Sequence, residues 1–146
     1  MIQELSTNLH GRRLASQIIV PPAIGDEVII TVPAGRIWEP FTLHAELAAG
    51  VGGGNRRAML IFTVGLAPCA MAFCHDTQAA TTTNFYHFLA GYHEYFDFGA
   101  INETYQGFPR GILLAAGDQF GTQLINIQAT DQWQNIAFSY FETLTP

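Results

Sequence analysis

Residues 41–47 read FTLHAEL and carry the clearest structural pattern of the chain. Apolar side chains at positions 41, 43, 45 and 47 alternate there with polar ones at 42, 44 and 46. Successive side chains of a β-strand point to opposite faces, so a period of two is typical of a strand. We therefore predict a strand with one packed face and one face turned to water or to a partner.

Short apolar runs separated by Pro and Gly continue this pattern on both sides. They include QIIV at 17–20 and EVIITV at 27–32, then residues 56–64, 69–73, 112–115, 120–128 and 133–144. In the last run Ile136, Phe138 and Tyr140 share one face. Many short strands without a long helical pattern predict an all-β fold, a single-domain antiparallel β-sandwich or jelly roll.

Three segments are predicted to lie outside the strands. Residues 48–55 are rich in glycine and read as a flexible hairpin loop. Residues 77–84, TQAATTTN, are polar and of low complexity, which indicates a surface loop. Residues 99–111 contain Pro109 and three glycines, and we expect them to be irregular.

The chain of 146 residues and 16.0 kDa is long enough for one domain with its own core. Its opening segment places Ile2, Leu5 and Leu9 at spacings of three and four, which permits a short helix or a docking arm. We therefore divide the chain into an N-terminal arm, 1–16, and a β-sandwich domain, 17–146.

The charge balance excludes several classes of protein. The chain has six Arg, no Lys and 12 Asp plus Glu, for a net charge of −6. Nucleic acid is not an expected partner, because phosphate binding needs clustered cations. The lack of Lys excludes P-loop and Schiff-base lysines. We predict neither a membrane partner nor a secretory signal, since no apolar run of 18 residues occurs, and expect synthesis in a cytoplasm.

Charged residues make up only 12% of the chain, against about 25% in a typical domain. The absence of Lys has two explanations. One is a codon bias toward Arg, and the other is a surface that is largely interface, where Lys and Glu are depleted.

Cys69 and Cys74 are separated by five positions, which puts them on opposite faces of a strand. We predict no disulfide and no thiolate metal site, and interpret both as small buried hydrophobic residues.

The histidines do not form a convincing metal motif. His87 and His93 would share a face of one strand but lie about 20 Å apart, and His75-Asp76 is a separate pair. We expect no metal and no cofactor.

Catalytic motifs are missing too. No Ser lies in a Gly-x-Ser-x-Gly elbow, and sequence spacing cannot establish a carboxylate pair among Glu94, Asp97 and Glu103. We expect no catalytic residue and no enzymatic activity.

Residues 85–98 hold seven aromatic side chains in fourteen positions. They are Phe85, Tyr86, Phe88, Tyr92, Tyr95, Phe96 and Phe98. Such side chains pack cores and subunit interfaces or stack on sugars. We take all seven as candidates for an oligomer interface.

Several strings resemble small virion structural proteins of tailed bacteriophages. They are VPAGRIW at 32–38, LHAEL at 43–47, GNRR at 54–57, LAAGD at 114–118 and NIQATDQW at 126–133. The resemblance covers the first 65 and the last 35 residues. It implies a β-sandwich that decorates or cements the head, often as a trimer, or that sits in the tail.

The resemblance leads to a specific expectation: a capsid decoration or cement protein that binds the head exterior and bridges major capsid subunits. It would be made in the host cytoplasm, act on the virion surface and form a homotrimer. The basic pairs Arg12, Arg13, Arg56 and Arg57 are the candidates for capsid contact. The alternative is a tail- or fibre-associated module that binds a host-surface glycan.

Overall fold

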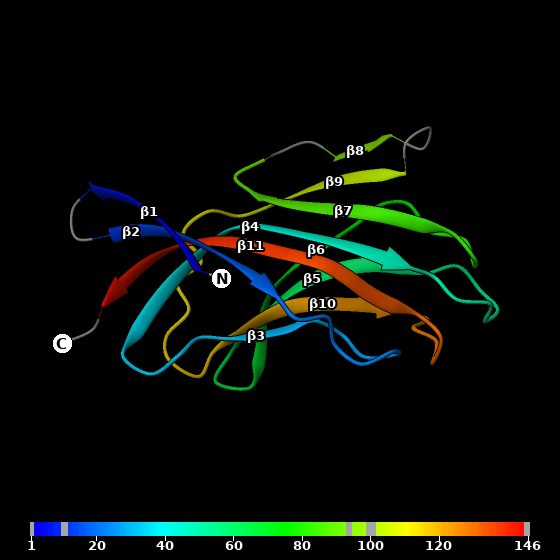
Figure 1. Cartoon of the computed structure of the whole chain (residues 1–146), viewed down its shortest axis with the longest axis horizontal. Coiled ribbons are helices and arrows are strands. Elements are labelled where there is room, and N and C mark those ends of the chain that lie inside the picture. The colour runs from blue at the N-terminus through cyan, green and yellow to red at the C-terminus, as the bar shows by residue number, and fades with distance from the viewer. Residues whose placement is uncertain (1, 10–11, 93–94, 99–101, 145–146) are drawn as a thin grey trace.

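The computed structural model describes residues 2–9, 12–92, 95–98 and 102–144, with side chains for 12–92 and 102–144. These residues form eleven β-strands in two sheets (Figure 1). Within these ranges no helix has the length and hydropathy needed to cross a bilayer. The predicted all-β sandwich is confirmed.

The strands follow one another along the whole chain. They are β1 (Ile2–Leu9), β2 (Arg12–Ile19), β3 (Ile29–Thr31), β4 (Arg36–Ala48), β5 (Arg57–Val64), β6 (Ala67–Phe73), β7 (Thr83–Ala90), β8 (Tyr95–Phe98), β9 (Glu103–Phe108), β10 (Gln119–Ile125) and β11 (Gln132–Leu144). The seven-stranded sheet has the order β1-β2-β11-β4-β7-β9-β8, and the four-stranded sheet has the order β3-β10-β5-β6.

The topology is that of a jelly roll. Four antiparallel pairs nest inside one another: β2 with β11, β3 with β10, β4 with β7 and β5 with β6. Such nested pairs, shared between two sheets, define the eight-stranded jelly roll. β1 extends one edge of the larger sheet, while β9 and β8 extend the other. β9 departs from the antiparallel plan because it pairs with β7 in parallel.

The alternating pattern acts as predicted at residues 43, 45 and 47, whereas Phe41 is only partly buried and Glu46 is buried as well. Leu43, Ala45 and Leu47 of β4 are 1%, 2% and 0% exposed and face the second sheet. Ile136, Phe138 and Tyr140 of β11 are buried beside them. Aromatic rings fill the space between the sheets. Examples are Trp38 with Tyr140 at 4.0 Å between ring centroids and Phe62 with Phe108 at 5.3 Å.

The N-terminal division at residue 16 is not what the structure shows. β2 runs across that boundary and pairs with β11, while β1 pairs with β2 as an edge hairpin. Residues 12–16 therefore belong to the larger sheet, and residues 2–9 form a strand where the sequence also allowed a helix.

Two further predictions of local structure were wrong. Residues 103–108 form β9 where an irregular segment was expected, because Thr104 and Phe108 are buried and Gly107 lets the Tyr92 carbonyl approach closely. Residues 112–115 contribute only a bridge between Leu114 and Trp38. Cys74 is buried as predicted, but Cys69 is exposed on edge strand β6, and neither is in a disulfide.

Candidate functional site

Arg56 is a buried structural residue. Its guanidinium forms an ion pair with Asp131, with 2.8 Å between Nη2 and Oδ1, and the two side chains are 0% and 1% exposed. Arg56 also donates to the carbonyl oxygens of Gly52 and Gly54 at 3.0 and 2.8 Å. Arg56 is therefore not available to a capsid surface, and its prediction as a contact residue is wrong.

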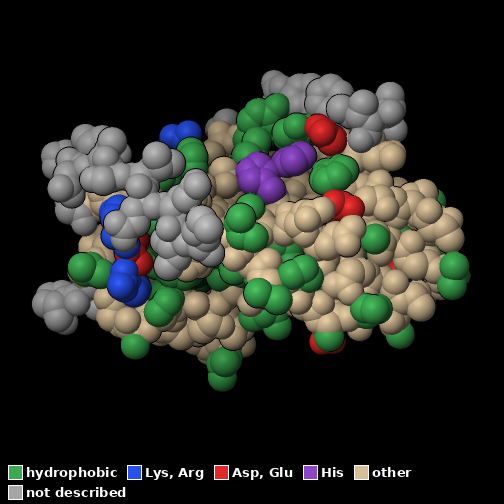
Figure 2. Space-filling view, in the orientation of Figure 1, with side chains coloured by type: hydrophobic (Ala, Val, Ile, Leu, Met, Phe, Trp, Pro, Cys, Tyr) green, Lys and Arg blue, Asp and Glu red, His purple; other side chains and the backbone are tan. Residues whose placement is uncertain are grey.

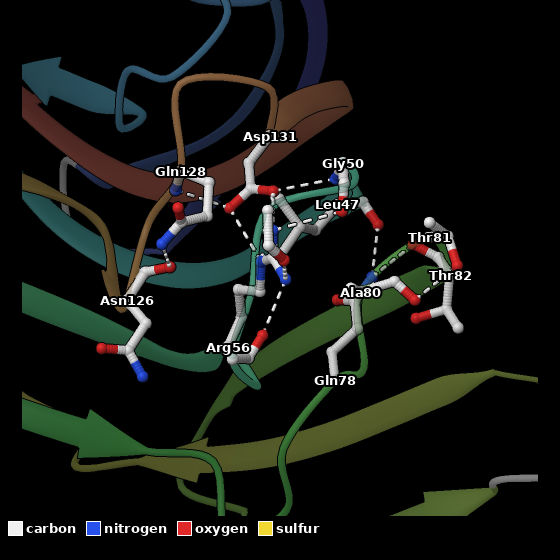
Figure 3. A network of polar contacts seen from close by, with 12 residues as sticks. Leu47, Gly50, Arg56, Gln78, Ala80, Thr81, Thr82, Asn126, Gln128 and Asp131 are labelled. Atoms are coloured by element: carbon white, nitrogen blue, oxygen red, sulfur yellow. Dashed lines mark hydrogen bonds and ion pairs between the residues drawn. The ribbon is translucent and has the colours of Figure 1, made fainter.

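Asp131 completes a network that fixes the glycine-rich loop (Figure 3). Its carboxylate accepts hydrogen bonds from the backbone N–H groups of Gly50 at 2.9 Å and Gln128 at 2.8 Å. Burial acts to raise the pKa of Asp131, but the hydrogen bonds from Arg56, Gln128 and Gly50 outweigh it and lower the pKa. The loop at residues 50–54 is thus held against the turn before β11.

Gln78 anchors the polar segment 77–84 to the same end of the sandwich. Its Nε2 donates to the carbonyl oxygens of Leu47 and Thr82 at 2.9 and 2.8 Å, and its Oε1 accepts from the Tyr86 hydroxyl at 3.0 Å. Gln78 is 6% exposed. The predicted surface loop is therefore tied to the core by one buried amide.

The other three candidate arginines lie at the surface. Arg12 forms an ion pair with Glu39, and Arg13 forms one with Glu142 at 2.8 Å. Both are partly exposed, and Arg57 is exposed. These three residues remain candidates for contact with a shell.

The aromatic segment is divided between the core and the surface. Tyr86 and Phe88 are 2% and 0% exposed and point inward from β7, so they are core residues and not interface residues. Phe85 points outward at 39% exposure, and Tyr92 is partly exposed. Tyr95, Phe96 and Phe98 belong to β8, and their side chains lie outside the described residues.

A histidine pair lies on the outer face of the seven-stranded sheet. His44 of β4 and His87 of β7 are direct partners in the register, and their Nδ1 atoms are 2.7 Å apart. Tyr105 of β9 stacks on His87 with 4.5 Å between ring centroids. Histidine side chains are visible near the centre of the face in Figure 2, next to hydrophobic and acidic side chains.

The environment favours the neutral form of both rings. Burial lowers the pKa of His44, and a charge on His87 would lower it further. Burial also lowers the pKa of His87, although Glu103 acts to raise it. One ring must donate and the other accept at the 2.7 Å contact, which two charged rings cannot do.

The described residues contain no group of three or more His, Cys, Asp or Glu side chains that could hold a metal ion. His75 pairs with Asp76 at 3.3 Å in an exposed position. His93 lies outside the described residues, and with it the predicted distance between His87 and His93. Glu94 also lies outside them.

The described surface is rich in hydrophobic side chains and poor in charge. Thirteen large hydrophobic side chains are exposed: Ile18, Val20, Ile24, Ile29, Val51, Val64, Leu66, Met71, Phe73, Phe85, Leu113, Ile125 and Leu144. The exposed charged side chains of the described ranges are Asp26, Arg57, Asp76 and Arg110. The larger-sheet face in Figure 2 likewise shows few acidic or basic side chains.

Many of the carboxylates are used inside the fold. Glu27 accepts hydrogen bonds from Thr122 and from the Trp133 indole at 2.7 and 3.0 Å. Glu142 accepts from the Trp38 indole at 3.0 Å, and it is 5% exposed. Part of the net charge of −6 is therefore carried by carboxylates that are engaged inside the fold and not by the surface.

A polar pocket of about 200 Å³ lies beside β7 and β9. Hydroxyl and amide side chains line it, including Thr82, Asn84, Asn102 and Thr104. Asn84 donates to the Thr104 hydroxyl at 2.8 Å. Groups of this kind can exchange hydrogen bonds with a hydroxyl-rich ligand.

Sequence reasoning missed both pairings that organise the molecule. Arg56 and Asp131 are 75 positions apart, so no local sequence pattern connects them. His44 and His87 meet only because β4 pairs with β7 in one particular register. The polar position of His44 in the alternating stretch was the one available signal, since it placed that ring on the outer face.

No family model matches the chain, and no curated protein matches it. Similar solved structures include that of the infectious bursal disease virus Gx strain, with 10% identity and a TM-score of 0.28 over 92% of this chain and 41% of that chain. Another is the T13 IBDV viral particle, with the same identity and TM-score over 97% of this chain and 43% of that chain. The chain thus spans about two fifths of the length of these chains.

Proposed function

We propose that the chain is a virion structural protein of a tailed bacteriophage, a capsid decoration or cement protein that acts as a homo-oligomer. Its role is mechanical and not catalytic. It binds the outside of the head and bridges neighbouring major capsid subunits, so that separating them also requires breaking its contacts. Many weak contacts of this kind add through multivalency.

The observation that carries this proposal is the surface of the described residues. Thirteen large hydrophobic side chains are exposed there, compared with four exposed charged side chains. Exposed hydrophobic patches on soluble proteins mark sites of association, and the cores of interfaces are depleted in charge. The resemblance of the strings at 32–38 and 126–133 to phage virion proteins supports a head or tail as the place of assembly.

The test is occupancy of particles. Purified chain is added to phage heads that lack it, and bound copies are counted after the unbound protein is removed. The proposal predicts saturable binding and heads that withstand a higher temperature before they release DNA. Saturation without a gain in head stability would contradict the cement role, and no binding would contradict the capsid location.

A tail- or fibre-associated module that binds a host glycan is the second candidate. The polar pocket beside Asn84 and Asn102 favours it. Jelly rolls also serve as lectin domains. Reproducible binding of the purified chain on a glycan array, lost in Asn84→Ala, would support this candidate. An array without signal would exclude the tested sugars.

A further inference from the structure

The outer face of the four-stranded sheet carries an apolar row that crosses all four strands. Ile29 of β3 pairs with Gly121 of β10, which pairs with Ile61 of β5, which pairs with Met71 of β6. Their sequence neighbours Ile30, Leu60, Phe62 and Ala72 are buried. The side chains of the row therefore point away from the core.

This row is exposed at both ends. Ile29 is 65% exposed and Met71 is 51% exposed. Phe73 and Ile125 extend the apolar surface on the same side at 49% and 43% exposure. Residues 64–74 at this edge read VGLAPCAMAFC and contain no charged side chain. Natural edge strands are usually protected by charges that prevent pairing or packing with another chain.

A groove interrupts the row at Gly121. It has a volume of about 230 Å³, and Ile29 and Ile61 form its two sides. Gly121 is part of the groove lining, so no side chain stands between Ile29 and Ile61 in the row. A Cβ atom there would lie 1.9 Å from the carbonyl oxygen of Val28, so the close approach of β3 requires glycine at this position.

We propose that this face binds a second copy of the chain about a two-fold axis that runs along β5. The strand register places the two halves of the proposed contact symmetrically about β5. Gly121 and Met71 lie on opposite sides of Ile61, one strand away on each side, and are therefore about 10 Å apart. A rotation about β5 exchanges their positions, so Met71 of each copy enters the Gly121 groove of the other, and the two Ile61 side chains meet.

The rotation also brings each residue of β5 opposite its own copy. The two Arg57 side chains therefore approach each other at the end of the sheet, where like charges repel. Contacts away from the axis occur twice in an isologous interface, so two Met71 side chains fill two grooves. The apolar contacts at Met71 and Ile61 stabilise the dimer, and the Arg57 pair opposes it.

This interface is separate from the aromatic segment and goes beyond the proposed function. An oligomer built through β7 and β8 would keep the four-stranded sheet free to join a further copy. On a phage head, the two-fold contact would link neighbouring decoration units. The two-fold interface and the proposed function can be tested separately. A chain that dimerises but never binds a head would contradict only the proposed function.

Sedimentation velocity on the full chain tests the interface. The wild type is expected to show an even-numbered assembly, and Met71→Glu is expected to halve its mass, because a carboxylate cannot enter the groove without losing its hydration. Ile29→Glu, at the other end of the row, gives a second variant. Ile18→Glu is the matched control. Ile18 is 71% exposed on the other sheet, so that change should leave the mass unaltered.

Removal of the Arg57 charge tests the orientation of the two copies. Arg57→Gln should strengthen the dimer, because the rotation about β5 places the two like charges opposite each other. A wild type that stays monomeric at all concentrations would overturn the proposal. So would folded Met71→Glu and Ile29→Glu variants that keep the wild-type mass, or an Arg57→Gln variant that dimerises more weakly than the wild type.

Discussion

Arg56 and Asp131 form a fully buried ion pair that joins the glycine-rich loop to the turn before β11, with 2.8 Å between Nη2 and Oδ1. Removal of one partner leaves a buried charge without compensation, which costs about 3–5 kcal/mol. Arg56→Ala should therefore lower the free energy of unfolding by about that amount, as measured by urea denaturation.

The neighbouring arginine is a matched control for this prediction. Arg57 is exposed, so Arg57→Ala should change the free energy of unfolding by less than about 0.5 kcal/mol. Equal effects of the two substitutions would show that the Arg56 network does not stabilise the fold.

Gly121 should not tolerate a side chain. A Cβ atom there meets backbone, the Val28 carbonyl oxygen at 1.9 Å, which cannot rotate away. Gly121→Ala is expected to destabilise the protein by about 1–3 kcal/mol, as other overpacked sites do. Gly53→Ala is the control, since nothing lies within 4 Å of its Cβ position. Thermal melts of both variants check the difference, and a stable Gly121→Ala would contradict the close approach of β3 to β10.

The histidine pair should make stability depend on pH. Burial lowers the pKa of His44 and of His87 below the ordinary value of 6.5. The unfolded chain then binds protons before the folded chain does. The contribution of the pair to stability is therefore complete above about pH 6.5 and is lost as the pH falls toward the folded-state pKa values.

Urea midpoints measured between about pH 7 and pH 5 check this dependence. His87→Gln should flatten the decline, because it removes one of the two shifted groups. His75→Gln should leave it unchanged, since His75 is exposed beside Asp76. A wild type with the same midpoint throughout this range would show that the pair does not resist protonation in the folded state.

Much of the fold could be predicted from local patterns. The alternation at residues 41–47 placed Leu43 and Leu47 in the core, and the turn residues marked most strand ends. Local patterns failed where a distant contact decides the structure. β9 forms because β7 offers it a parallel edge, and the segment around residue 106 has no alternation strong enough to reveal this.

The candidate site could be predicted less well, because the sequence does not show which polar groups are used internally. Arg56 and Arg57 are adjacent, yet one is fully buried and the other is exposed. Phe85 and Tyr86 differ in the same way, since successive residues of β7 face opposite sides. A pair or a cluster in the sequence therefore does not identify a surface until the strand register is known.

We propose that the exposed hydrophobic surface of this chain is covered in an assembly on a phage head. Quantitative mass spectrometry of purified particles, with the major capsid protein as internal reference, is the decisive experiment. We expect the chain to be present in fixed proportion to the major capsid protein. Particles that contain no copy of it, although the chain is made during infection, would rule the proposal out.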